Sequence, residues 1–289
     1  NLAIAGAFDS FGATRSQYFQ QTPDESNYLE KIIRSAAKLK ENEQAAQVSL
    51  FEDDPMAQIS EPEIPTCEPW PTMELLRKEK EVVGIYLSGH PLDDFKKELE
   101  LFTKAEIALL SSDLEALVGR ELTLGGVVTE SEDRLSRNGK KWGTFSLEDY
   151  SGTHVFRVFG EEYLKYEHFF KPGNFLFVRL LIREGYTNRD TGATTDPRLQ
   201  FNEVKLLQDV MEQQSKKLTL HLKASEIDEA KIQQIERIIK SFKGKKPLSF
   251  ALHDEALSVQ LKSRKNQIAI CTELLEMLDH ENIQYAVNA

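Results

Sequence analysis

The sequence predicts a multi-domain α+β protein: an N-terminal helical region with an extended linker, a five-stranded β-barrel, and a C-terminal α/β sandwich. Three observations carry this prediction. Apolar residues recur at helical spacing over residues 28–44, alternate at strand spacing in short runs over residues 120–207, and follow a βαββαβ order after residue 217. A chain of 289 residues is long enough for two or three domains that each bury a core.

Charge and composition narrow the class of protein. The formal net charge is −11, but the acid lies mainly in residues 1–118, with 22 Asp/Glu against 11 Lys/Arg; residues 119–209 carry 14 against 13 and residues 210–289 carry 11 against 12. Any nucleic-acid contact therefore depends on local basic clusters. Two distant cysteines make neither a disulfide framework nor a metal motif. No apolar run reaches the roughly 18 residues of a membrane span, so the cytoplasm is the expected location.

The helical region starts with NLAIAGAFDSFGATR at residues 1–15, which is typical of the end of a helical unit, and the start at Asn1 suggests a fragment. Residues 28–44 predict an amphipathic helix. Several prolines and acids in residues 47–72 then predict an extended linker. A second helix is expected over residues 73–87, where Ser-Gly-His-Pro at 88–91 stops it.

The linker begins with an unusual peptide, Gln47-Val48-Ser49-Leu50-Phe51, which sets two large apolar side chains in a solvated segment. One interpretation is that Leu50 and Phe51 pack back on their own domain. The other is a linear motif in which both fill a partner's pocket while Gln47 makes side-chain hydrogen bonds. The residues alone leave both interpretations open.

The barrel is predicted from strands at residues 122–128, 142–147, 154–159, 175–183 and 199–207, with the first strand weakened or bulged at Gly125–Gly126 and a helix at 161–169 after the third strand. Three strands, a helix and two strands fit the five-stranded OB barrel. The sheet face and loops of that fold commonly hold single-stranded nucleic acid.

Alternation assigns the faces of the second and third strands. Phe145, Leu147, Phe156 and Val158 fall on the core side. The opposite side of these strands, which faces solvent, offers a surface on which bases can stack. The basic hairpin tip beside it, which has an Asn-Gly turn, offers phosphate contacts. The predicted single-strand site comprises Arg134, Arg137, Lys140, Lys141, Trp142, Thr144 and Arg157. The plainer interpretation is a solvated loop beside a half-buried tryptophan.

The C-terminal region, residues 217–289, predicts a small βαββαβ unit. Its first helix, over residues 227–242, presents Ile232, Ile235, Ile238 and Ile239 at core spacing. The region has no Gly-rich phosphate loop, no acid pair at catalytic spacing and no nucleophile–base arrangement. A docking module is therefore expected rather than an enzyme.

Several segments together resemble the C-terminal portion of the alpha subunit of bacterial DNA polymerase III. They are AGAFDSFGATR (Ala5–Arg15), QVSLF (Gln47–Phe51), EKEVVGIYLSGHPLDDF (Glu79–Phe95), and GGVV, NGKKWGTFSLEDYSG and FRVF within Gly125–Phe159. The resemblance runs from residue 1 to about residue 210 and continues more weakly to the end.

The resemblance implies a division of labour. It implies that Gln47, Val48, Ser49, Leu50 and Phe51 insert into the sliding clamp (the beta subunit). Residues 1–46 would be the end of a helix-hairpin-helix and clamp-binding helical region, and residues 47–72 would be an acidic linker that carries the clamp peptide. Residues 73–118 would be a helical connector, and residues 119–209 would be an OB-fold domain. Residues 210–289 would be a domain that binds the tau subunit of the clamp loader. The palm and its Mg²⁺-binding carboxylates are not in this sequence, so the fragment is expected to use no cofactor and not to polymerise, although the parent is a DNA-directed DNA polymerase.

Two alternatives remain at this point. One is a free-standing OB-fold nucleic-acid-binding accessory protein. The other is an enzyme built on the C-terminal unit, against which the lack of an acid–base constellation argues.

Overall fold

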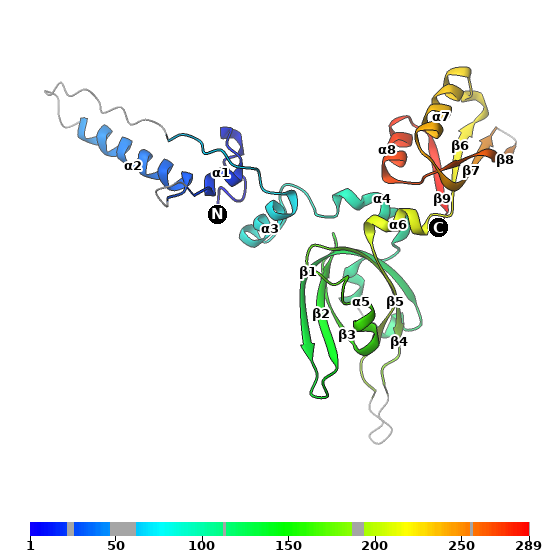
Figure 1. Cartoon of the computed structure of the whole chain (residues 1–289), viewed down its shortest axis with the longest axis horizontal. Coiled ribbons are helices and arrows are strands. Elements are labelled where there is room, and N and C mark those ends of the chain that lie inside the picture. Colours follow the sequence, from blue (N-terminus) through cyan, green and yellow to red (C-terminus); the bar gives the residue numbers. More distant parts are fainter. Residues whose placement is uncertain (22–25, 47–61, 112–113, 187–193, 255–256, 289) are drawn as a thin grey trace. The chain divides into compact units, whose positions relative to one another are not determined.

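A computed structural model describes residues 1–21, 26–46, 62–111, 114–186, 194–254 and 257–288 (Figure 1). The chain divides into two compact units, Asn1–Pro91 and Leu92–Ala289, which are taken separately below.

The described residues of unit 1 contain three α-helices, α1 (Arg15–Phe19), α2 (Tyr28–Ala46) and α3 (Thr72–Val83), and a 3₁₀ turn at Asp9–Phe11. A small core of Ala3, Ala13, Tyr18 and Tyr28 packs around α1 and the start of α2. Helix α3 ends before the predicted Leu87, because Gly84 adopts a left-handed conformation (φ 90°) and its N–H bonds the Lys80 carbonyl. The tight turn therefore begins at the first glycine rather than at the second.

Unit 2 opens with short turns and helix α4 (Lys96–Phe102), followed by 3₁₀ turns at Ile107–Ser111 and Glu115–Leu117. A five-stranded antiparallel sheet follows, with order β3-β2-β1-β4-β5. Its elements are β1 (Glu121–Leu135), β2 (Lys141–Glu148), β3 (Thr153–Phe159), α5 (Gly160–Tyr166), β4 (Phe175–Arg183) and β5 (Arg198–Leu206). The predicted order of three strands, a helix and two strands is present and is consistent with an OB-like domain. A closed barrel is not confirmed, since no pairing joins β3 to β5 in the part of the chain that the structure describes.

The core of this sheet is aromatic at its centre. Phe145, on β2, stacks on Phe156 of β3 at 5.0 Å and on Phe170 at 4.1 Å between ring centroids. Leu147 and Val158 are buried with them, which confirms the predicted core side of both strands. Buried aromatic pairs of this kind contribute beyond their apolar area, so the sheet face opposite to this core is held in a defined position.

Strand β1 is longer than predicted, and it has no bulge at its glycines. It runs through Gly125–Gly126, and its register shifts instead between Val128 and Glu130. Gly125 allows the Leu99 side chain of α4 to approach the strand closely, since a Cβ on Gly125 would lie 2.1 Å from Leu99 Cδ2. Because Leu99 of α4 occupies this space, a larger residue at position 125 would require the Leu99 side chain to move.

The C-terminal part of unit 2 confirms the predicted βαββαβ order. It comprises β6 (Lys217–Lys223), α7 (Glu229–Ser241), β7 (Lys243–His253), β8 (Ser258–Ile268), α8 (Thr272–His280) and β9 (Gln284–Asn288), preceded by α6 (Leu207–Gln214). The sheet order is β8-β7-β6-β9, and β6 and β7 are parallel. The Lys97 amine of α4 bonds Asp279 on α8 and, at 3.3 Å, the Tyr285 hydroxyl on β9.

One predicted core residue of this part is wrong. Ile235, Ile238 and Ile239 are buried, but Ile232 is 48% exposed. Ile232 lies in the first turn of α7, just after the cap at Asp228, whereas the buried residues of the helix, Ile235, Ile238 and Ile239, all lie in later turns. Spacing predicts the helix face on which a residue lies, but it does not predict how deeply that residue is buried.

This difference gives a matched test within a single helix. We expect Ile238→Val to destabilise the protein by about 1 kcal/mol, because it removes a buried methyl group. Ile232→Val should change stability by less than about 0.5 kcal/mol, as exposed substitutions do. Urea unfolding followed by circular dichroism measures both, and equal losses would contradict the burial difference.

Candidate nucleic-acid interface

The face of β2 and β3 opposite the aromatic core carries an aromatic pair. Trp142 and Phe159 are cross-strand partners, and their rings stack at 5.2 Å between centroids with 17° between planes. Phe159 is 58% exposed, although it is large and apolar. The next pair along the same face is Thr144 with Arg157. An exposed flat aromatic surface beside a cation is what a nucleic-acid base needs for stacking.

Arg134 extends this surface onto β1. It is the register partner of Trp142, and its guanidinium carbon lies 5.4 Å from the tryptophan ring centroid, within cation–π range. The same guanidinium also donates to the Glu132 carboxylate at 2.6 Å. Arg134 is therefore held over the aromatic pair, with part of its charge already compensated.

The hairpin tip is formed as predicted, although it is shorter. Residues 136–140 close the turn through a bond from the Gly139 N–H to the Ser136 carbonyl at 2.9 Å, with Gly139 at φ 71°. Arg137 and Lys140 are exposed, and neither forms an ion pair with a described residue. Arg134 and Lys141 belong to strands instead, and Lys141 lies 3.6 Å from the Glu167 carboxylate.

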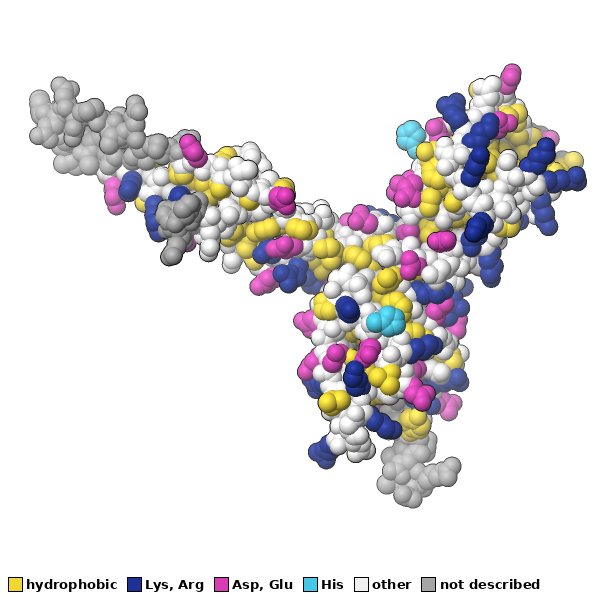
Figure 2. All heavy atoms as spheres, viewed as in Figure 1, with side chains coloured by type: hydrophobic (Ala, Val, Ile, Leu, Met, Phe, Trp, Pro, Cys, Tyr) yellow, Lys and Arg dark blue, Asp and Glu magenta, His cyan; other side chains and the backbone are white. Residues whose placement is uncertain are grey.

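Carboxylates lie on the same face as these cations. Glu132 is opposite Thr144 and Glu130 is opposite Ser146 in the register of β1 and β2. Figure 2 shows acidic and basic side chains intermixed over this sheet rather than a continuous basic field. The exposed cations of this region without an ion pair to a described residue are Arg137 and Lys140 at the tip and Arg157 on the strand face.

Two aromatic positions were missed by the sequence prediction. Phe159 follows the alternation of β3 and could have been found, because it falls on the same side as Arg157. Tyr186, which is 66% exposed, lies after β4 under the Arg198 guanidinium at 4.1 Å from its ring centroid. No periodicity marks a residue in a loop, so only the contact identifies this second cation–aromatic pair.

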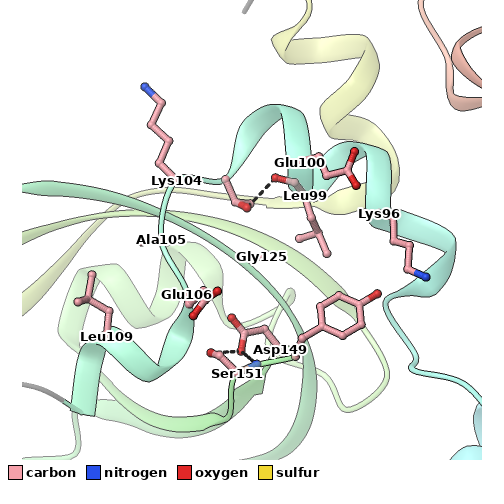
Figure 3. A pocket seen from close by; sticks show the side chains of 12 residues that line it. Lys96, Leu99, Glu100, Lys104, Ala105, Glu106, Leu109, Gly125, Asp149 and Ser151 are labelled. Carbon is pink, nitrogen blue, oxygen red and sulfur yellow. Dashed lines mark hydrogen bonds between the residues drawn. The ribbon is translucent and has the colours of Figure 1, made fainter. Parts of the chain in front are cut away.

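The LEDYSG segment, strong in the resemblance, has a structural role. The Asp149 carboxylate accepts bonds from the backbone N–H groups of Ile107 at 2.8 Å, Ser151 at 2.7 Å and Gly152 at 3.1 Å. It thus fixes the β2–β3 turn and attaches the preceding 3₁₀ turn to it. The adjoining pocket, of about 840 Å³, has α4 on one side and this turn on the other (Figure 3). Its central carboxylate is fully engaged by hydrogen bonds, so the pocket does not offer Asp149 as a catalytic base.

Other predicted features fall elsewhere. The peptide Gln47–Phe51 lies outside the described residues. Among the residues that the structure describes, no group of three or more His, Cys, Asp or Glu could hold a metal ion. A search of the same residues found no helix with the length and apolarity needed to cross a membrane.

Comparisons with known proteins point to the same family as the sequence resemblance. Residues 218–288 match the model of the DNA polymerase III alpha subunit, C-terminal domain. DNA polymerase III subunit alpha of Campylobacter jejuni is 31% identical over 176 residues, which is 60% of this chain and 14% of that protein. The Caulobacter vibrioides subunit is 30% identical over 62% of this chain and 15% of its own length.

A third relative, the subunit of Escherichia coli K12, is 28% identical over 61% of this chain and 15% of its own length. The chain thus spans about a seventh of the length of these relatives. Among solved structures, the second OB-fold domain of replication protein A from Methanococcus maripaludis matches 33% of this chain and 91% of that chain at 13% identity, with a TM-score of only 0.21. The predicted resemblance is confirmed by the family match and the relatives: this chain is similar to the C-terminal portion of the bacterial DNA polymerase III alpha subunit.

Proposed function

We propose that this chain is a non-catalytic, template-holding and docking part of a replicative polymerase alpha subunit that works in the bacterial cytoplasm. The observation that carries the template-holding role is the stack of half-buried Trp142 on exposed Phe159, with the Arg134 guanidinium over the Trp142 ring. Bases of a single strand would stack on this pair, and Arg137 and Lys140 at the tip would contact phosphates. Such a site binds single strands without reading their sequence.

Two docking roles complete the proposal. The peptide Gln47–Phe51 would bind the sliding clamp, and residues 210–289 would bind the tau subunit of the clamp loader. Attachment to a ring around DNA makes rebinding intramolecular, so a modest peptide affinity keeps the polymerase at the template. Nucleotidyl transfer, and the Mg²⁺ that it needs, would belong to another part of the parent polymerase.

The stacking surface can be tested with single-stranded oligonucleotides at low salt. We expect Trp142→Ala to weaken binding by roughly 1–3 kcal/mol, because each stacked base contributes about that much. Fluorescence anisotropy measures the affinity. Trp70→Ala is the matched control, since Trp70 stacks on Phe19 in unit 1 and takes no part in the sheet. Equal affinities of Trp142→Ala and wild type would remove the sheet face from the proposal.

The same assay tests the tip. Replacing Arg137, Lys140 and Lys141 with Ala should flatten the salt dependence, with a loss of about 0.7 in slope for each phosphate contact. The control replaces the exposed lysines Lys104, Lys165 and Lys171 with Ala, and this removes the same charge from other parts of unit 2. If both triple variants bind alike, the tip is not the phosphate contact.

A further inference from the structure

The antiparallel pair of β7 and β8, at one edge of the C-terminal sheet, has a polarised distribution of charge. Asp254, the described acid of this pair, directly follows β7 at the hairpin end. The cations of the pair lie toward the other end, where Lys246 pairs with Ile268 and Lys262 is opposite Ser249. The set is Lys243, Lys245, Lys246, Lys262, Arg264 and Lys265, called the basic ribbon below. Half of the 12 cations of residues 210–289 are thus in this pair of strands.

The ribbon is accessible and its charge is uncompensated. Strand β8 is the edge of the sheet, and Lys262, Arg264 and Lys265 on it are exposed. None of the six cations forms an ion pair within the described residues, whereas Lys223 and Lys240 of the same module pair with Glu226 and Glu236. Figure 2 shows Lys and Arg side chains gathered on the side of the module that carries these strands.

The lysine-bearing end of β7 is held in place by its backbone. A Cβ on Gly244 would lie 2.3 Å from the Ala269 backbone nitrogen, so the strand passes directly against the residue that follows β8. The Ala269 N–H also bonds the Phe242 carbonyl at 2.8 Å. Lys243 and Lys245, on either side of this glycine, therefore start from a fixed backbone rather than from a free loop.

We propose that the basic ribbon is a second nucleic-acid contact, which binds the phosphate backbone without reading bases. It is separate from the sheet face of Trp142 and goes beyond the function proposed above. Uncompensated Lys and Arg side chains at an exposed edge are suited to phosphate contacts. The ribbon carries no aromatic ring among its six positions and their neighbours on β8, so stacking has no part in it.

The distribution over two strands favours nucleic acid over an acidic peptide. A peptide added along the edge would meet the side chains of β8, but Lys243, Lys245 and Lys246 lie one strand further in, about 4.8 Å away. Lysines that only prevent edge-to-edge pairing would likewise be needed on β8 alone. A nucleic acid is wide enough for its phosphates to contact the cations of both strands.

The test uses the full chain and fluorescence anisotropy with labelled oligo-dT and a duplex of equal length, longer than the roughly 16 nucleotides that one OB fold covers. The ribbon variant is Lys262→Gln, Arg264→Gln and Lys265→Gln. The control variant is Lys223→Gln, Arg237→Gln and Lys240→Gln, which removes the same charge from β6 and α7 of the same module. Both are also made in a Trp142→Ala, Phe159→Ala background, which removes the stacking surface of the sheet.

In that background, the ribbon variant should bind oligo-dT about tenfold or more weakly than its parent, and its salt slope should fall by about 2, for three contacts at roughly 0.7 each. The control variant should keep the affinity of the parent. If the background alone loses all binding, or if ribbon and control variants behave alike, the inference is overturned and the function proposed for the sheet face still stands. Ribbon-dependent binding of poly-glutamate as tight as that of oligo-dT would assign the ribbon to an acidic protein segment and also overturn it.

Discussion

Arg15→Met is expected to destabilise unit 1 by about 3–5 kcal/mol, because it leaves a buried carboxylate without its counter-ion. That carboxylate belongs to Glu79, which is fully buried, and the Arg15 guanidinium that pairs with it is only 9% exposed. Arg15 also donates to Asp9 at 2.7 Å and to the Ser88 hydroxyl at 3.0 Å.

The network joins two segments that carry the family resemblance. Arg15 closes the AGAFDSFGATR segment, and Glu79 and Ser88 belong to the segment at Glu79–Phe95. Glu79 further accepts from the backbone N–H groups of Leu87 at 2.9 Å and Ser88 at 3.0 Å. The chain between α3 and Pro91 is therefore fixed to the N-terminal segment by charged hydrogen bonds, which are stronger than neutral ones.

Unfolding of unit 1 can be followed separately. Trp70 is the tryptophan of this unit, so a Trp142→Phe background leaves its fluorescence as the only tryptophan signal. Arg34→Met is the control, because Arg34 forms only an exposed pair with Glu30 at 3.9 Å and should change stability by less than about 1 kcal/mol. A loss for Arg15→Met no larger than that of the control would show that the buried pair is not a stabilising contact of unit 1.

The same network predicts a pH dependence. Burial of the Glu79 carboxylate raises its pKa, but hydrogen bonds from Ser88 and Arg15 outweigh burial and lower the pKa from 4.5 to about 2. Because the folded pKa lies below the unfolded one, the stabilisation is fully present above pH 4.5 and is lost as the pH falls toward about 2. Glu79→Gln should remove this part of the acid sensitivity of unit 1, measured by urea unfolding at each pH.

The second large effect concerns the linker peptide. Leu50→Ala together with Phe51→Ala should weaken binding to the sliding clamp by about 4 kcal/mol, or roughly a thousandfold, because each anchor side chain contributes about 2 kcal/mol or more. Isothermal titration calorimetry with purified clamp measures the affinity. Met56→Ala with Ile59→Ala is the control, since it removes two other apolar side chains from the same linker.

The alternative interpretation predicts a different result. If Leu50 and Phe51 pack back on their own domain, the double variant lowers the melting temperature while the control does not. Unchanged clamp affinity in the Leu50 and Phe51 variant would reject the motif, whatever the melting temperature.

Local pattern alone was enough for most of the elements and their order, although helix α6 (Leu207–Gln214) was not predicted. Strand alternation put Phe145 and Phe156 in the core because a pleated strand has a period of two residues, and this holds before any partner is known. The βαββαβ order after residue 217 followed from changes of period in the same way. Trp142 and Arg157 were also placed opposite the core side of their strands by alternation, and Arg157 is exposed while Trp142 is half-buried.

Tertiary structure decided which residues are in contact and how deeply each of them is buried. Arg15 and Glu79 are 64 residues apart, so no local pattern could pair them. Ile232 has the spacing of a core residue but is 48% exposed, whereas Ile235 is buried. Phe159 forms one surface with Trp142 only because the register of β2 and β3 places them opposite each other. Local spacing sets the direction of a side chain, whereas long-range packing and register set its neighbours, and binding surfaces depend on the neighbours.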